Sequence, residues 1–142
     1  CAESRETLGG TCLNVGCIPS KAMLHASELY DHAANGMMAK LGIEVAPKLN
    51  LETMHGQRRD AVKGLTGGIE FLFKKNKVDW KKGRASFVDA HTVKVGEETV
   101  TAKNVVIATG SSVASLPGIA IDNANHIVVD STGALELPAV PG

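Results

Sequence analysis

The sequence predicts an α/β fold in which helices pack on a parallel β-sheet, and its periodicity carries that prediction. Residues 19 to about 40 and residues 50–76 repeat apolar side chains with the period of an α-helix. Residues 85–100 alternate between apolar and polar side chains, as antiparallel strands do. Residues 105–108 are all apolar, which is typical of a strand buried on both faces of a parallel sheet. Helices combined with a strand of this last kind favour the α/β class.

Composition disfavours several classes of protein. The chain has 142 residues, 44% of them hydrophobic, which suits one domain with a core. Its 15 basic and 15 acidic residues cancel, so we expect neither a nucleic acid nor a membrane as partner. No apolar run reaches the length of a membrane-spanning helix, and Glu3 and Glu6 interrupt any secretory signal. The 3 cysteines are too few for a secreted disulfide scaffold, which favours a reducing compartment.

The helical segments have recognisable ends. The first helix is expected to begin at Pro19, which the first turn of a helix tolerates, and to end by Gly36 or Gly42. Asn50 can cap the second helix, which is expected to run until Asn76. The apolar stripes are Met23, Ala26, Leu29, Tyr30, Ala33 and Met37 in the first helix, and Leu51, Met54, Ala61, Val62, Leu65, Ile69, Leu72 and Phe73 in the second.

Strands are expected after the helices. The alternating segment predicts short antiparallel strands around Ala85, Phe87, Thr92, Val93, Val95 and Val100, with a turn at residues 96–98. The apolar run at 105–108 is closed by Thr109 and Gly110. Residues 111–142 contain several prolines and read mostly as loop, and residues 138–142 look like the start of a linker.

Cys12 and Cys17 lie in the segment LGGTCLNVGCIPSK, and residue types alone leave three interpretations open. A structural zinc site needs further ligands, but the CxxxxC spacing has no second pair, so Cys1 and His25 would have to be recruited. Two inert buried thiols are the second interpretation, because cysteine is often buried. The third interpretation is a redox-active pair.

The surrounding residues favour the redox interpretation. On an ideal helix, Cα atoms five positions apart lie about 8.7 Å from each other, which exceeds the roughly 7 Å limit for a disulfide. Gly16 and Pro19 allow the irregular backbone that a bond would need. A disulfide that closes so short a loop adds little stability. The positive end of a helix and the charge of Lys21, within about a turn, instead stabilise thiolates, which are the reactive form in thiol–disulfide exchange.

The segment GGTCLNVGCIPSK resembles the redox-disulfide motif of the flavin-dependent pyridine nucleotide-disulfide oxidoreductases. Within that family, CLNVGCIPSKAMLHASELY, GIEFLFKKNKV and LPGIAIDNANHIVVDSTGAL are similar to the dihydrolipoamide dehydrogenases, and the similarity covers nearly the whole chain. The resemblance implies that residues 1–142 are part of a three-layer α/β dinucleotide (FAD)-binding domain. An antiparallel β-meander would be inserted before the final parallel strand.

The resemblance also implies a reaction. Cys12 would be the outer thiol, which exchanges with dihydrolipoamide on a lipoyl carrier domain of a 2-oxoacid dehydrogenase or glycine cleavage complex. Cys17 would be the inner thiol, which lies against the flavin. Two electrons would pass from this dithiol to FAD and then to NAD+. The enzyme would be a homodimer of the cytoplasm, or alternatively of the mitochondrial matrix.

Further residues match cofactor-binding positions of the family, whereas no metal ligand is predicted. Glu3 corresponds to the acidic residue that ends the second strand of the dinucleotide fold and binds the adenosine ribose. Lys21 would approach the flavin ring near its reactive nitrogen. The other matches are Gly9, Gly10 and Thr11 near the phosphates, Ala85 near the adenine with Gly83 as the alternative register, and Thr109, Gly110 and Ser111 at a second flavin contact.

Parts of the family's pattern are absent from this sequence. No GxGxxG precedes the position of Glu3, so the domain is expected to be incomplete at its N-terminus, without its first strand and phosphate-binding turn. The NAD-binding domain and the interface domain with its catalytic histidine are also expected to lie outside these residues, and none of the 5 histidines present is expected to replace that base. The 142-residue chain by itself is therefore expected to be inactive and poorly stable.

Two other functions stay open. A sister reductase for glutathione or mercuric ion shares the Gly-Gly-Thr-Cys core, although the residues after Cys17 and the closing segment are less similar to either. A flavin-free thiol switch or interaction module would use the same cysteine pair without an enzymatic reaction.

Overall fold

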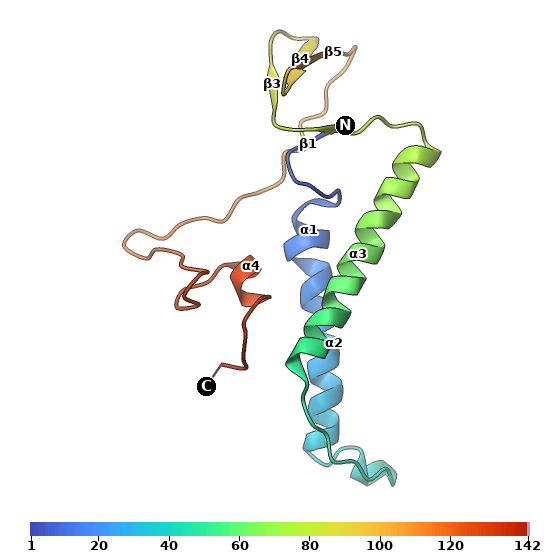
Figure 1. The fold of residues 1–142 in the computed structure, drawn as a ribbon, viewed down its shortest axis with the longest axis vertical. Helices are drawn as coiled ribbons and strands as arrows, with labels where there is room; N and C mark the ends of the chain where they lie inside the picture. Colours follow the sequence, from blue (N-terminus) through green and yellow to red (C-terminus); the bar gives the residue numbers. More distant parts are fainter. Residues whose placement is uncertain (142) are drawn as a thin grey trace.

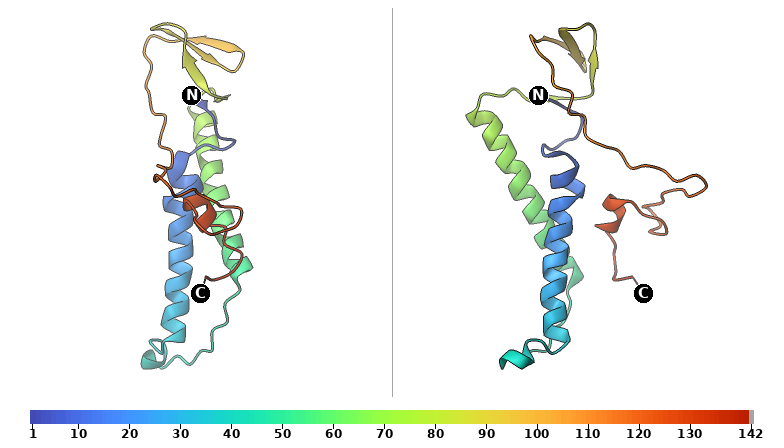
Figure 2. Two further views of the ribbon diagram at one scale, coloured as in Figure 1. Left: turned by 90° about the vertical axis from the view of Figure 1, so that its left-hand side faces the viewer. Right: turned by 180° about the vertical axis from the view of Figure 1, so that it is seen from behind.

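The chain is elongated in the computed structural model, which describes residues 1–141 (Figure 1). Long helices form its stem, the sheets lie at one end near the N-terminus, and the C-terminal segment returns beside the stem (Figure 2). The elements are β1 (Ala2–Glu3), α1 (Gly10–Val15), α2 (Cys17–Ala34), the 3-10 helix η1 (Ala39–Leu41), α3 (Leu51–Lys75), β2 (Lys81–Lys82), β3 (Ala85–Phe87), β4 (Thr92–Val95), β5 (Glu98–Thr101) and α4 (Ser131–Ala134).

Helix α3 has the predicted ends. The side-chain oxygen of Asn50 accepts a hydrogen bond from the backbone amide of Thr53 at 3.0 Å, which satisfies one of the free amides of the first turn. At the other end, the backbone amide and the side-chain amide of Asn76 both donate to the carbonyl of Leu72, at 2.9 and 2.8 Å. Asparagine therefore closes this helix at both ends.

Helix α2 differs from the prediction at both ends. It begins at Cys17 rather than Pro19, and the proline sits in the first turn, where its missing amide hydrogen would have had no partner inside the helix. It ends at Ala34, short of Lys40, because Gly36 adopts a φ of 72°, a left-handed conformation that stops a helix. Met37 fits the helical spacing of apolar residues in the sequence, but it lies beyond the end of the helix.

Two sheets confirm the mixed α/β character of the chain. Strands β1 and β2 pair in parallel, with Ala2 opposite Lys81 and Glu3 opposite Lys82. Strands β3, β4 and β5 form an antiparallel sheet in that order, and β4 pairs with β5 from Thr92 opposite Thr101 to Val95 opposite Glu98. The tight turn between β4 and β5 uses Gly96 at a φ of 59°. The predicted antiparallel meander is therefore present.

The parallel strand expected at residues 105–108 does not form. These residues have no regular secondary structure, and Val106 and Ile107 are 87% and 70% exposed. A strand needs a neighbour to pair with, and within residues 1–141 the parallel sheet consists only of the two-residue strands β1 and β2. The apolar run is therefore exposed to solvent. Of the sheet layer expected for a three-layer fold, the described residues form only the short pair β1 and β2.

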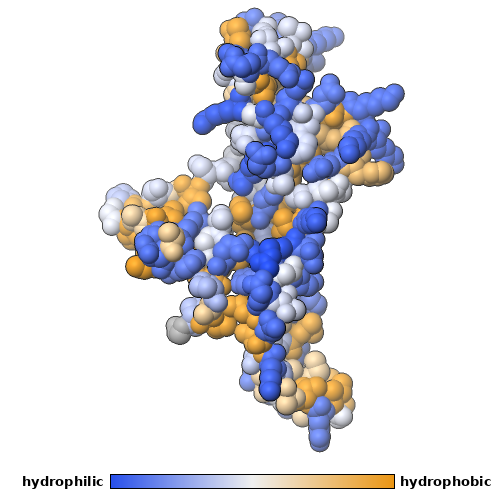
Figure 3. Space-filling view, viewed as in Figure 1, coloured by the Kyte–Doolittle hydropathy of each residue, from blue (hydrophilic) through white to orange (hydrophobic). Residues whose placement is uncertain are grey.

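Apolar surface is extensive in this chain. Figure 3 shows hydrophobic residues gathered at the end of the stem that carries η1, where Met37, Leu41, Ile43 and Val45 are all exposed. The buried apolar side chains of the described residues are few, and Leu8 is among the most buried of them at 3% exposure. No helix within residues 1–141 has both the length and the apolar character needed to cross a membrane.

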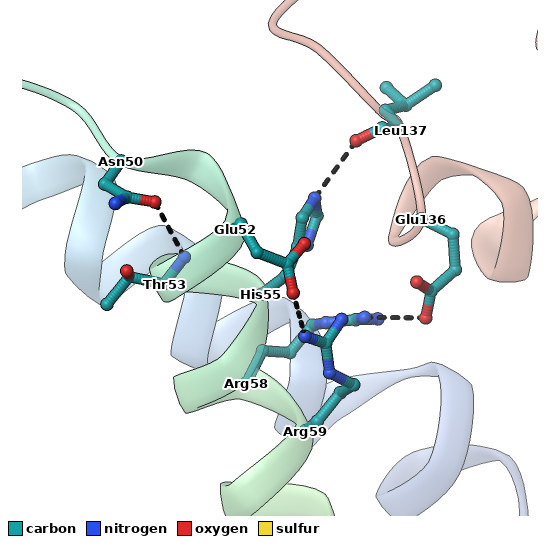
Figure 4. Close-up of polar contacts among 8 residues, drawn as sticks. All are labelled: Asn50, Glu52, Thr53, His55, Arg58, Arg59, Glu136 and Leu137. Atoms are coloured by element: carbon teal, nitrogen blue, oxygen red, sulfur yellow. Dashed lines mark hydrogen bonds and ion pairs between the residues drawn. The ribbon is translucent and has the colours of Figure 1, made fainter.

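Polar contacts fasten the C-terminal segment to α3 (Figure 4). The buried guanidinium of Arg58 donates to the Glu136 carboxylate at 2.6 Å, and the Nε2 atom of His55 lies 3.0 Å from the carbonyl oxygen of Leu137. The two side chains from α3 lie about one helical turn apart, so they point the same way and hold neighbouring residues of the segment. The return of the chain along the stem therefore depends on this contact.

Replacing Arg58 by alanine is expected to lower the free energy of unfolding by about 2–3 kcal/mol, because a buried side-chain stem is lost together with an ion pair whose arginine is buried and whose glutamate is exposed. Arg59 is the matched control, since it is the next residue of α3 and also pairs with a glutamate, Glu52, but is half exposed. The Arg59→Ala change should cost at most about 1 kcal/mol. Urea unfolding measures the free energy of unfolding of both variants. Equal losses would contradict the conclusion that the Arg58 contact holds the C-terminal segment on α3.

Acid is expected to loosen α4. The Asp130 carboxylate caps this helix, and its hydrogen bonds from the Gly133 amide, from Asn123 and from the Thr132 amide lower the Asp130 pKa below its usual value near 3.8. A lowered pKa stabilises the folded state above the unfolded-state pKa, and this stabilisation is lost as the pH falls through the folded-state pKa. The protection factor of the Gly133 amide against hydrogen exchange should therefore fall below about pH 4. This fall should be absent in Asp130→Asn, and its persistence there would contradict the prediction.

Candidate active site

Cys12 and Cys17 form a disulfide at the junction of α1 and α2. Their Cα atoms are 4.6 Å apart, about half the separation that an unbroken helix would impose. Both cysteines are exposed, so a second thiol can reach them. The third cysteine, Cys1, is free and lies at the N-terminus. The geometry therefore combines a closed pair with access for an exchanging partner.

Gly16 creates the break that brings the sulfurs together. It ends α1 and precedes α2, with φ and ψ of −133° and −113°. A Cβ atom at this position would lie 2.9 Å from the backbone oxygen of Thr11 and 3.3 Å from the Cα of Cys12. These contacts involve backbone atoms, which cannot turn aside as a side chain would. The predicted role of Gly16 in an irregular backbone is confirmed by this close approach.

The Gly-Gly pair turns the chain into α1. Gly9 and Gly10 have φ values of 103° and 59°, a left-handed region that other residues adopt at a cost. The space where a Cβ of Gly10 would lie is open, with no atom of the described residues within 4 Å. Thr11 follows in the first turn of α1, where backbone amides have no partner inside the helix. A ligand can therefore approach the backbone closely at this turn.

Two charged residues predicted for the site lie on different elements, Lys21 on α2 and Glu3 on β1. Lys21 is in the first turns of α2, four residues after Cys17, and its side chain is exposed. Glu3 ends β1, and its carboxylate accepts a hydrogen bond from the backbone amide of Arg5 at 2.9 Å. The carbonyl of Glu3 accepts from the amide of Gly83 at 2.8 Å, so β1 and the residue after β2 are joined at that point.

The other predicted residues are not gathered at the dithiol. Ala85 is exposed in β3, on the antiparallel sheet. Thr109, Gly110 and Ser111 are exposed in the irregular segment after β5, which swings away from the α1–α2 junction before it returns as α4 (Figure 1). Residues 105–108, which directly precede Thr109, do not form the expected strand. A strand there would have fixed the position of the three residues that follow it.

Sequence reasoning overlooked Asn14. Its side-chain amide donates to the carbonyls of Leu8 and Gly10, at 3.2 and 2.8 Å, and its side-chain oxygen lies 2.5 Å from the donating hydroxyl of Thr7. The signal available in the sequence was the residue type itself, an asparagine between the two cysteines, because asparagine side chains readily form hydrogen bonds with nearby backbone groups.

No group of three or more histidine, cysteine, aspartate or glutamate side chains within residues 1–141 is placed to hold a metal ion. Cys12 and Cys17 are bonded to each other, whereas a zinc site uses cysteines as separate thiolate ligands.

A family model described as "Pyridine nucleotide-disulphide oxidoreductase" matches residues 3–141. "Dihydrolipoyl dehydrogenase 3" of Pseudomonas putida is 59% identical over 146 residues, which cover 99% of this chain and 31% of the relative. "Dihydrolipoamide dehydrogenase" of Chaetomium thermophilum is 54% identical over 99% of this chain and 29% of the relative. The mitochondrial dihydrolipoyl dehydrogenase of Schizosaccharomyces pombe is 50% identical over 99% of the chain and 28% of the relative.

A solved structure shares the fold. The HOCl-induced flavoprotein disulfide reductase RclA of Escherichia coli, in a Cu(II) complex, superposes with a TM-score of 0.69 at 23% identity. The superposition covers 99% of this chain and 28% of that protein. This chain therefore spans about 31% or less of the length of each relative described here.

Proposed function

The chain belongs to the pyridine nucleotide-disulphide oxidoreductase family, and on that basis we propose that it is the dithiol-bearing segment of a dihydrolipoyl dehydrogenase. The observation that carries the proposal is the exposed Cys12–Cys17 disulfide, closed across the break at Gly16, in a segment that matches the redox-active disulfide of the family. Relatives at 50–59% identity over the whole chain support this enzyme over its sister reductases.

The reaction at the dithiol is two thiol–disulfide exchanges. A thiolate of dihydrolipoamide attacks Sγ of Cys12, the Cys12–Cys17 bond breaks, and Cys17 leaves as a thiolate. The second thiolate of the substrate then attacks the substrate sulfur that is bonded to Cys12. This closes the lipoamide ring and releases Cys12 as a thiolate. The substrate has lost two electrons and two protons, and the electrons now reside on the cysteine pair. The exposed cation of Lys21 and the start of α2 favour the Cys17 thiolate.

The residues around the dithiol suit a flavin dinucleotide. The open space at Gly10 and the free amides at the start of α1 would receive phosphate oxygens, and Glu3 would accept hydrogen bonds from ribose hydroxyls. Lys21 would lie toward the flavin ring. Electrons of the reduced dithiol would leave through FAD to NAD+, which is the chemistry that this cofactor supplies when bound. Ala85, Thr109, Gly110 and Ser111 are proposed as further contacts that depend on a completed sheet.

The domain assignment is part of the same proposal. Residues 1–142 would belong to a three-layer FAD-binding domain, with residues 138–142 at the start of a linker to the NAD-binding domain. The exposed apolar run at 105–108 supports this, because a strand of that composition is suited to burial between sheet neighbours. The partner would be a lipoyl domain, the whole enzyme a homodimer, and its compartment a reducing one.

Steady-state kinetics of the full-length protein test the function. We expect bound flavin, and NADH formation from dihydrolipoamide and NAD+, with a kcat/KM at least about 100-fold above that for reduction of glutathione disulfide or mercuric ion with either nicotinamide nucleotide. A protein that binds flavin but prefers one of those two substrates is the sister reductase. A full-length protein that binds no flavin would overturn the proposal in favour of a thiol switch.

A further inference from the structure

Helix α1 is too short to hold its own shape. It has 6 residues, and helices of this length are unstable in water unless other contacts support them. Cys12 lies in the middle of α1, so any fraying of this helix moves Cys12 relative to Cys17. Gly16 ends α1 at the C-terminal side, where a Cβ atom would clash with the backbone of Thr11. The N-terminal end needs a separate support.

Asn14 supplies that support. Its side chain reaches back along α1 and binds residues 7–10 at three points: the hydroxyl of Thr7 and the carbonyls of Leu8 and Gly10. The side chain of Leu8 is buried at 3% exposure, so this loop is itself anchored. A second contact, from Arg5 to the hydroxyl of Thr11, is longer at 3.5 Å. Asn14 is therefore the main polar tie between the anchored loop and the helix that carries Cys12.

We propose that Asn14 is a positioning residue of the Cys12–Cys17 couple, which keeps the two sulfurs within bonding distance after the disulfide has been reduced. An amide suits the position because it donates to two carbonyls and accepts from one hydroxyl at the same time. Without this tie the reduced thiols separate, their effective concentration falls, and the disulfide becomes easier to reduce. The inference rests on the proposed redox role of the pair.

Thiol trapping of the full-length protein tests the inference. The protein is equilibrated without oxygen in dithiothreitol buffers of graded redox ratio, in which reduction of the protein disulfide is balanced by oxidation of dithiothreitol to its cyclic disulfide. Alkylation and mass spectrometry then count free Cys12 and Cys17. Asn14→Leu should raise the equilibrium constant for reduction about tenfold, which corresponds to a potential about 30 mV more positive. Thr7→Val, which removes one of the bonds, should raise it about threefold.

Asn76→Leu is the matched control. Asn76 also donates its side-chain amide to the carbonyl four residues earlier, at the same 2.8 Å, but at the end of α3. A purely structural role predicts that both leucine variants lose stability and leave the reduction equilibrium unchanged. Positioning predicts that only the Asn14 and Thr7 variants shift it. The Thr7 variant keeps the test decisive if Asn14→Leu folds poorly.

The outcomes separate this inference from the proposed function. A wild-type protein in which Cys12 and Cys17 stay free in every buffer has no redox couple, and the proposed function fails with it. A wild-type protein with a normal midpoint, together with an unchanged midpoint in Asn14→Leu and Thr7→Val, overturns only the role of Asn14.

Discussion

Replacing Cys17 by serine in the full-length protein is expected to lower dihydrolipoamide oxidation by at least about 1000-fold. The hydroxyl of serine cannot form the disulfide, so Cys12 stays a free thiol, and the thiols of dihydrolipoamide have no disulfide sulfur to attack. Cys12→Ser should lower the rate by a similar factor, because it removes the sulfur that the substrate attacks. Steady-state formation of NADH measures both effects.

Cys1→Ser is the matched control, because it makes the same chemical change at a free and exposed cysteine outside the disulfide. We expect its turnover to equal that of the wild type. Absorbance gives a second readout: the long-wavelength band of a thiolate beside the flavin should vanish in Cys17→Ser. If that variant kept the band, or more than about a tenth of the activity, Cys17 would not be the inner thiol.

The second large effect is expected from Gly16→Ala. Its new methyl group would press on the backbone of Thr11 and Cys12, at 2.9 and 3.3 Å, and neither contact can be relieved by rotating a side chain. Forced overpacking of this kind costs about 1–3 kcal/mol. Because opening the junction relieves the clash and parts the cysteines, the equilibrium constant for reduction of the disulfide should rise about 30-fold. Equilibration with dithiothreitol and thiol trapping measures it.

Gly64→Ala controls for the loss of a glycine. Gly64 lies within α3, and no atom of the described residues lies within 4 Å of its added Cβ. Alanine there should stabilise the protein by up to about 1 kcal/mol, through helix propensity, and leave the disulfide equilibrium unchanged. An unchanged equilibrium in Gly16→Ala would mean that the break between α1 and α2 does not bring the cysteines together.

Features set by neighbouring residues were predictable from the sequence. Asn50 caps α3 as predicted, because the hydrogen bond to Thr53 spans only three residues. The hairpin of β4 and β5 was also predictable, since alternation and a glycine turn both act locally. The Cys12–Cys17 pair belongs to this group, because Gly16 lies between the two residues that it brings together. The early end of α2 was missed because the apolar period continues past Gly36.

Features that need distant partners were not predictable in the same way. The ion pair of Arg58 with Glu136 joins residues 78 positions apart, and no periodic pattern reports such a contact. The run at 105–108 has the composition of a buried strand, yet composition supplies no neighbour for it to pair with. The positions of Thr109, Gly110 and Ser111 relative to the dithiol were therefore left to the tertiary structure.

The sequence by itself determined the two long helices α2 and α3 (apart from the ends of α2), the antiparallel hairpin and the dithiol with its flanking glycines and lysine, because each depends on hydrogen bonds and steric contacts between near neighbours. Only the tertiary structure decided which apolar segments are covered, how the C-terminal segment returns to α3, and that Asn14 ties the loop to α1. These outcomes depend on which surfaces meet in space, and a strand or an ion pair forms only where its partner is present.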